Sequence, residues 1–171
     1  MNPVFKEVSP RAISDNAFRA IGEQWMLITA GTLDAFNTMT ASWGAWGELW
    51  NGPVAICFVR PQRYTFGFMN SATHFTLSFF SEAFRPALDY CGSHSGRDVD
   101  KIAATGLTPV AAPTGAVYFS EARLVLECRK LYSQDLTPDG FHDPRIAPAM
   151  YPHADYHRMY VGQVLRCLVQ E

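Results

Sequence analysis

Short runs of β-forming residues, joined by brief connections, constrain the fold of this chain more than any other feature. Six runs are predicted as strands, at residues 25–29, 36–43, 53–59, 74–80, 117–131 and 157–169. Most connections are too short for the repeated crossover helices that join parallel strands. The pattern predicts a mainly β fold, a six-stranded antiparallel barrel, closed or partly closed, with short peripheral helices. Gly162 inside the last strand predicts a β-bulge.

Capping signals predict four short helices, at residues 10–21, 62–70, 82–90 and 97–105. Pro10 suits a first helical position, and Gly22, Gly92 and Gly106 suit helix exits. Either Ser95 or Asp98 could cap the last of these helices. Residues 44–52 and 138–152 are predicted as loops, and the second is long enough to be functional or flexible. With no linker visible, residues 1–171 are predicted to form one domain.

Composition excludes several classes of partner. The net charge is -2 and no basic block occurs, so neither nucleic acid nor an anionic membrane is an expected partner. No apolar run approaches about 18 residues, so neither a signal peptide nor a membrane span is predicted. The four cysteines form no CxxC pair, which predicts free, mostly buried thiols and a cytoplasmic protein.

One segment combines small polar residues with a large flat side chain. It reads Asn37, Thr38, Met39, Thr40, Ala41, Ser42, Trp43. A flavin ring has a hydrogen-bonding edge and apolar faces, so it needs this mixture. The alternative is an ordinary edge strand whose hydroxyls face water.

Two further segments could bind an anion. Arg60 and Arg63 flank a predicted helix start directly after an apolar strand, a place where guanidinium groups and helix amides bind phosphate. Ser93, His94 and Ser95 lie in a glycine-flanked loop with exposed backbone amides. The alternatives are solvated arginines in the first case and helix caps in the second.

His157 enters the last predicted strand beside aromatic residues, so it could face a ring or donate to a carbonyl. His153 lies nearby, but no third ligand stands at a metal-binding spacing, and no metal site is predicted. Motifs of hydrolases and of Rossmann dehydrogenases do not occur in the sequence.

Taken together and in order, these segments resemble the flavin-reductase-like family of FMN-binding split barrels. The resemblance runs from about Ser9 to Glu171. It implies a homodimer that holds FMN near its interface, with NADH or NADPH as hydride donor. Relatives often carry lysine where this chain has His94.

The resemblance also implies roles for individual residues. Residues 37–42 would contact the flavin ring, with Trp43 as a wall of the site. Arg60, Arg63 and Thr65 would form the phosphate and ribityl side, and Ser93, His94 and Ser95 a second phosphate anchor. Ser78, Phe79 and Phe80 would offer backbone groups to the flavin. His157 would lie near the nicotinamide or the flavin edge, as the candidate catalytic residue.

Three functions are compatible with this resemblance. The first is an NAD(P)H-dependent flavin reductase, in which the protein positions two cofactors for hydride transfer. The second is a flavoredoxin-like electron carrier that keeps FMN and docks a redox protein. The third is a flavin-binding module without turnover.

Overall fold

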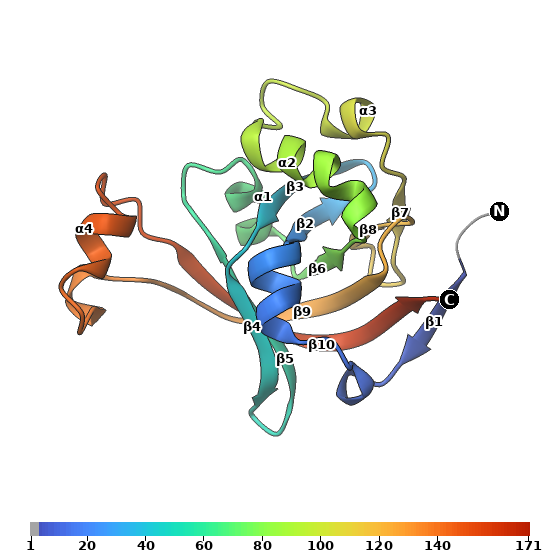
Figure 1. The fold of residues 1–171 in the computed structure, drawn as a ribbon, viewed down its shortest axis with the longest axis horizontal. Helices are drawn as coiled ribbons and strands as arrows, with labels where there is room; N and C mark the ends of the chain where they lie inside the picture. The colour runs from blue at the N-terminus through green and yellow to red at the C-terminus, as the bar shows by residue number, and fades with distance from the viewer. Residues whose placement is uncertain (1–3) are drawn as a thin grey trace.

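The computed structural model describes residues 4–171 and is mainly β (Figure 1). Within that range it contains ten strands. They are β1 (Phe5–Val8), β2 (Met26–Thr32), β3 (Ala35–Ala41), β4 (Gly44–Leu49), β5 (Gly52–Val59), β6 (His74–Phe79), β7 (Pro109–Ala111), β8 (Val117–Phe119), β9 (Leu124–Asp135) and β10 (Arg158–Gln170). All six predicted strand regions contain a strand, which confirms the predicted mainly β antiparallel class.

Eight of these strands form one sheet, ordered β3-β2-β6-β9-β10-β5-β4, with β1 on the far part of β10. Every pair is antiparallel, and β7 and β8 form a separate hairpin. β3 and β4 are the two ends of the sheet, yet only Ser42 and Trp43 connect them. The sheet must therefore curve until its two ends come together. This makes a partly closed barrel in which β3 and β4 are not paired with each other.

Both faces of the central strands are buried. Ile28 of β2 belongs to a core cluster with Phe75, while its neighbour Leu27 belongs to a second cluster with Leu88 and Phe119. Alternate residues of a strand point to opposite faces. Two buried faces therefore explain why these strands read as continuous apolar runs rather than as alternating ones.

The bulge predicted at Gly162 is confirmed. The β9–β10 register shifts between Val161 and Gly162, and again between Val164 and Arg166. The extra residues are Leu131 on β9 and Leu165 on β10, and both are exposed. A side chain at Gly162 would meet the ring of Phe75, so a residue without a Cβ is needed for this packing.

The predicted loop over residues 44–52 is wrong, because β4 and β5 form a hairpin there. Its two turn residues, Trp50 and Asn51, have φ values of 52° and 59°. A type I′ turn requires positive φ at both positions. Tryptophan is an unusual residue for such a turn, so the sequence did not predict a hairpin.

Four α-helices are present in the described residues: α1 (Thr65–Ser71), α2 (Arg85–Ser93), α3 (Lys101–Thr105) and α4 (Ile146–Met150). Short 3-10 turns occupy Pro10–Ala12, Glu82–Phe84 and Pro138–Gly140. A π-helical segment runs over Phe18–Gln24.

Three helix predictions need correction. The first predicted helix is two segments, because Asn16 accepts hydrogen bonds from the amides of Phe18 and Arg19 and starts a new turn. α2 extends through Gly92, so this glycine is not its exit. α3 starts late because Asp100 caps it rather than Ser95 or Asp98, whereas its predicted end at Gly106 is confirmed.

The last third of the chain differs most from prediction. The strand predicted over residues 117–131 is two strands, β8 and β9, separated by a turn. The loop predicted over 138–152 contains α4. Figure 1 shows the whole connection between β9 and β10, residues 136–157, reaching away from the barrel with α4 on it. We refer to it as the arm.

All four cysteines are free and buried, as predicted. No helix in residues 4–171 has the length and apolar character needed to cross a membrane.

Candidate functional site

A cavity of about 190 Å³ lies where β3, β5 and β10 approach one another, and we call it the site cavity. It is lined by Met39, Thr40, Ala41, Ser42, Trp43, Phe58, Arg60, Arg63 and His157. Eight of these nine residues belong to the set predicted from the sequence. The exception is Phe58, which lies within an apolar run that gave no sign of facing a cavity.

Aromatic rings form one wall of the site cavity. The ring of Trp43 lies 5.0 Å from the imidazole of His157, and the ring of Phe58 lies 6.4 Å from it, nearly perpendicular. Trp43 remains 43% exposed although it lines the cavity. A flat, partly open aromatic wall of this kind suits a planar ligand.

The two arginines predicted to bind an anion differ in their hydrogen-bond partners. Arg60 donates to the carboxylate of Asp155 and to the backbone carbonyl of Met150, at 2.9 Å, and it lies over the ring of Tyr151. All three partners come from the arm. Arg60 is therefore neutralised by a carboxylate that the sequence analysis did not connect with it.

Arg63 keeps a donor free. Its Nη1 donates to the carbonyl of Gly92 at 2.9 Å, but its Nη2 is buried and has no hydrogen-bond partner in the described residues. Burial lowers the pKa of this guanidinium. A buried donor without a partner costs free energy, so Arg63 is the better placed of the two to receive an anion.

Part of the predicted flavin-contact strand makes hydrogen bonds within the fold. Asn37 donates to the hydroxyl of Thr65 at 2.7 Å, and the hydroxyl of Thr38 lies 2.9 Å from that of Thr29. Asn37, Thr38 and Thr65 are buried and do not line the site cavity. Thr40 does line the cavity, but its hydroxyl donates to the carbonyl of Leu88 in α2.

Ser78, Phe79 and Phe80 are not brought to the site cavity. β6 lies between β2 and β9, so the backbone of Ser78 and Phe79 is paired on both sides. Phe80 packs between Phe84 and Phe119 in the core. The strand pairing leaves the backbone of Ser78 and Phe79 little capacity for a ligand, and the role of the three residues in flavin binding stays a prediction.

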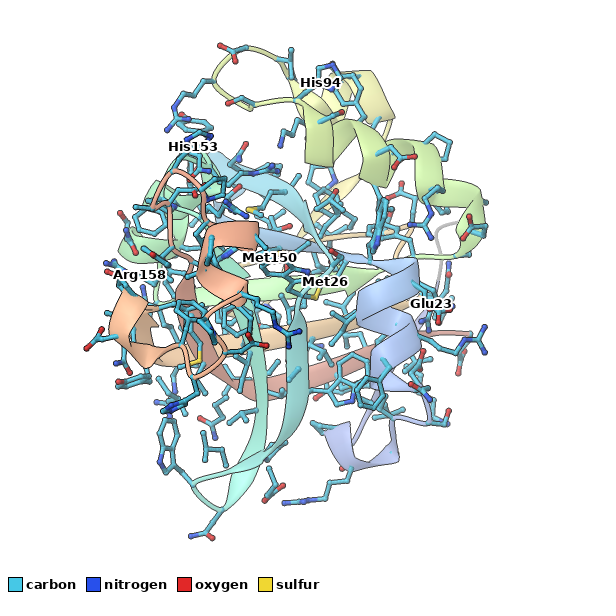
Figure 2. All side chains as sticks on the ribbon, turned by 60° about the vertical axis from the view of Figure 1, so that its left-hand side comes forward. Glu23, Met26, His94, Met150, His153 and Arg158 are labelled. Carbon is cyan, nitrogen blue, oxygen red and sulfur yellow. The ribbon has the colours of Figure 1, made fainter. Side chains whose placement is uncertain are left out.

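Ser93, His94 and Ser95 lie at the end of α2, outside the site cavity. Ser93 donates to the carbonyl of Asp89, and His94 stacks on Tyr90 at 4.0 Å. The hydroxyl of Ser95 accepts from the amide of Arg97. In Figure 2, His94 lies at the top of the molecule, well apart from Met150 on α4. These contacts favour the alternative of a helix end, and their role as a phosphate anchor stays a prediction.

A larger cavity of about 800 Å³ shares Arg63 with the site cavity. Aromatic residues of the α1 region, Tyr64, Phe66 and Phe68, line it together with Arg97. No pattern in the sequence predicted this cavity. Arg63 therefore lies between the site cavity and this larger cavity.

His157 is buried, and its Nδ1 lies 2.9 Å from the hydroxyl of Tyr151. The pKa of His157 is lowered to about 4, mainly by burial and then by the charge of Arg60, while Asp155 opposes the shift. The imidazole is therefore neutral near neutral pH. Residues 4–171 hold no group of three or more His, Cys, Asp or Glu side chains placed to bind a metal ion.

This shift predicts an acid-dependent loss of stability. Between the ordinary histidine pKa of 6.5 and about 4, the unfolded chain binds a proton at His157 that the folded chain does not. As the pH is lowered from 6.5 to about 4, the free energy of unfolding should therefore decrease, by up to roughly 3 kcal/mol. Above pH 6.5, His157 should contribute no pH dependence to it. Urea unfolding of wild type and His157→Gln across this range measures the effect. Equal slopes for the two proteins would contradict it.

Comparison with known proteins adds a family and a fold. The model of the flavin reductase like domain matches residues 18–171. No curated protein matches the sequence.

Several solved structures share the fold. An FMN-binding domain of a flavin reductases-like enzyme from Shewanella baltica superposes with a TM-score of 0.71 at 15% identity, over 99% of this chain and 78% of that one. Flavoredoxin of Desulfovibrio vulgaris gives 0.68 at 23% identity, over 97% and 76%. An NADH:FAD oxidoreductase of Streptomyces globisporus gives 0.64 at 17% identity, over 86% and 77%.

Proposed function

Because the chain belongs to the flavin reductase-like family, we propose that it binds FMN at the site cavity and passes a hydride to it from NADH or NADPH. The observation that carries this proposal is the convergence of residues 39–43, Arg63 and His157 on one cavity. Among the proteins that share the fold is an enzyme described as an NADH:FAD oxidoreductase, which supports a nicotinamide donor.

The residues present fit a flavin mononucleotide. The buried Nη2 of Arg63 has no partner, and a phosphate oxygen would satisfy it. Trp43 and Phe58 offer apolar surface to a ring, and Ser42 offers a hydroxyl at its edge. Since Thr40 already donates to α2, we assign hydrogen bonding toward the ring to Ser42 rather than to both.

When bound, the flavin supplies the hydride-accepting chemistry. The chain's own residues hold and orient the reactants. Arg63 fixes the phosphate end, and Ser42 donates a hydrogen bond where negative charge develops. His157 is neutral and lines the cavity, so it presents a hydrogen-bonding group without adding a charge.

The size of the cavity supports the predicted homodimer. At about 190 Å³ it is smaller than the roughly 300–1,000 Å³ typical of pockets for small ligands and cofactors. We propose that a second copy of the chain completes the site beside the exposed ring of Trp43. We also place the protein in the cytoplasm, in keeping with its four free cysteines.

The proposed function predicts a yellow protein whose flavin is bleached rapidly by NADH or NADPH without air. Purified protein is loaded with FMN, freed of excess, and mixed anaerobically with each nicotinamide while the flavin absorbance is followed. Failure to take up FMN would overturn the proposal entirely. Stable FMN that nicotinamide reduces only slowly, but that a redox protein reoxidises rapidly, would favour the flavoredoxin-like carrier. FMN that is never reduced would favour a binding module.

A further inference from the structure

Tyr151 and His157 form a buried pair at the edge of the site cavity. Tyr151 caps the C-terminal end of α4, is 5% exposed, and places its hydroxyl 2.9 Å from Nδ1 of His157. Their rings meet edge to face, with centroids 5.6 Å apart. Tyr151 lies in the segment predicted as a loop, so no sequence pattern indicated a role for it.

The direction of this hydrogen bond follows from the chemistry of the two groups. A neutral imidazole has one N–H and one acceptor nitrogen, and a phenol has one O–H. The phenol is the more acidic donor and the imidazole nitrogen the stronger base. Burial raises the pKa of the Tyr151 phenol, and the guanidinium of Arg60, 5.1 Å from the centre of its ring, only partly opposes that rise, so the phenol keeps the proton that it donates.

A phenol that donates to Nδ1 leaves the proton of the imidazole on Nε2. Nδ1 is engaged on the arm side, so Nε2 is the nitrogen available to the site cavity that His157 lines. The contact between His157 and Trp43 restrains rotation of the ring. Such second-partner hydrogen bonds are what select the tautomer of a histidine.

We propose that Tyr151 is a positioning residue, which donates to Nδ1 of His157 and so presents Nε2–H to the cavity as a donor for a carboxamide carbonyl. The ligand part of this inference rests on the proposed function, since the carboxamide is that of the nicotinamide. The tautomer part rests on the fold alone.

The tautomer is tested in the protein without flavin, labelled with ¹⁵N-histidine, by long-range proton–nitrogen correlation at neutral pH. Wild type should show an unprotonated Nδ1 and a protonated Nε2 for His157. In Tyr151→Phe the donor is lost while the ring packing is kept, so the two nitrogen shifts should move toward each other. Tyr156→Phe is the matched control, because the ring of Tyr156 packs against that of Tyr151, with centroids 4.8 Å apart, but its hydroxyl makes no hydrogen bond to His157 within the described residues.

The ligand part is tested by anaerobic reduction of the FMN-loaded variants. Tyr151→Phe should raise the KM for the nicotinamide about two- to tenfold, the effect of one hydrogen bond, with kcat changed less. Tyr156→Phe should match wild type in both.

The outcomes separate the two proposals. A protonated Nδ1 in wild type, or unchanged shifts in Tyr151→Phe, would overturn the positioning role whatever the activity. The expected tautomer with an unchanged KM would overturn the carboxamide contact. The expected tautomer in a protein that nicotinamide cannot reduce would support Tyr151 and refute the proposed function.

Discussion

Arg63→Ala is expected to weaken FMN binding about 5- to 150-fold, which corresponds to roughly 1–3 kcal/mol for a charge-assisted hydrogen bond. The expectation follows from two observations: Arg63 lines the site cavity, and its buried Nη2 has no partner within the described residues. Titration of the flavin-free protein with FMN, followed by flavin fluorescence, measures the change.

Riboflavin provides the decisive comparison, because it has the same ring without the phosphate. If Arg63 holds the phosphate, Arg63→Ala should leave riboflavin affinity nearly unchanged. Equal losses for both flavins would show that Arg63 acts through the end of α2, where it donates to Gly92. Arg129→Ala removes the same charge from an exposed position that hydrogen bonds to Gln163, and it should not affect either flavin.

Gly162→Ala is expected to destabilise the fold by about 1–3 kcal/mol, the usual effect of overpacking a core. An added Cβ would lie 2.6 Å from Cζ of Phe75 and 2.8 Å from Cβ of Cys128. All of these groups lie in the barrel core, so neither neighbour can move into solvent. Chemical denaturation of wild type and variant gives the difference in free energy of unfolding.

Gly47→Ala is the matched control for this substitution. Gly47 is also a strand glycine, in β4, and a Cβ added there would meet nothing within 4 Å. Its variant should stay within about 0.5 kcal/mol of wild type. Gly162→Ala should be less destabilising in a Phe75→Leu background than in wild type, since Phe75→Leu removes the two ring atoms nearest the added Cβ. Equal stability of the two alanine variants would refute the packing argument.

The strand prediction succeeded where burial imposes a pattern. Residues 25–29 and 74–80 are apolar because β2 and β6 are covered on both faces, and that requirement is visible in sequence. Segment 44–52 carries no such requirement, since β4 is an end of the sheet and its residues are mostly exposed. A hairpin held by partner pairing rather than by burial leaves little trace in local composition.

The site was predictable only in part, for a similar reason. Residue type indicated that Ser42, Trp43, Arg63 and His157 could serve a flavin, and the fold brings them to one cavity. Residue type could not show that the hydroxyl of Thr40 donates to α2, nor that Asp155 neutralises Arg60. Those facts depend on pairs distant in the chain, for which a single sequence carries no signal.

The two-residue link between β3 and β4 has a mechanical consequence. β3 and β4 do not pair with each other, and Ser42 and Trp43 connect them directly along the chain. The same two residues also line the site cavity. A molecule bound in the site cavity would contact β3 through Met39 and β5, the strand paired with β4, through Phe58. Ligand binding would therefore hold β3 close to the β4–β5 hairpin. The bound ligand would stabilise the closed barrel, and the closed barrel would in turn favour ligand binding.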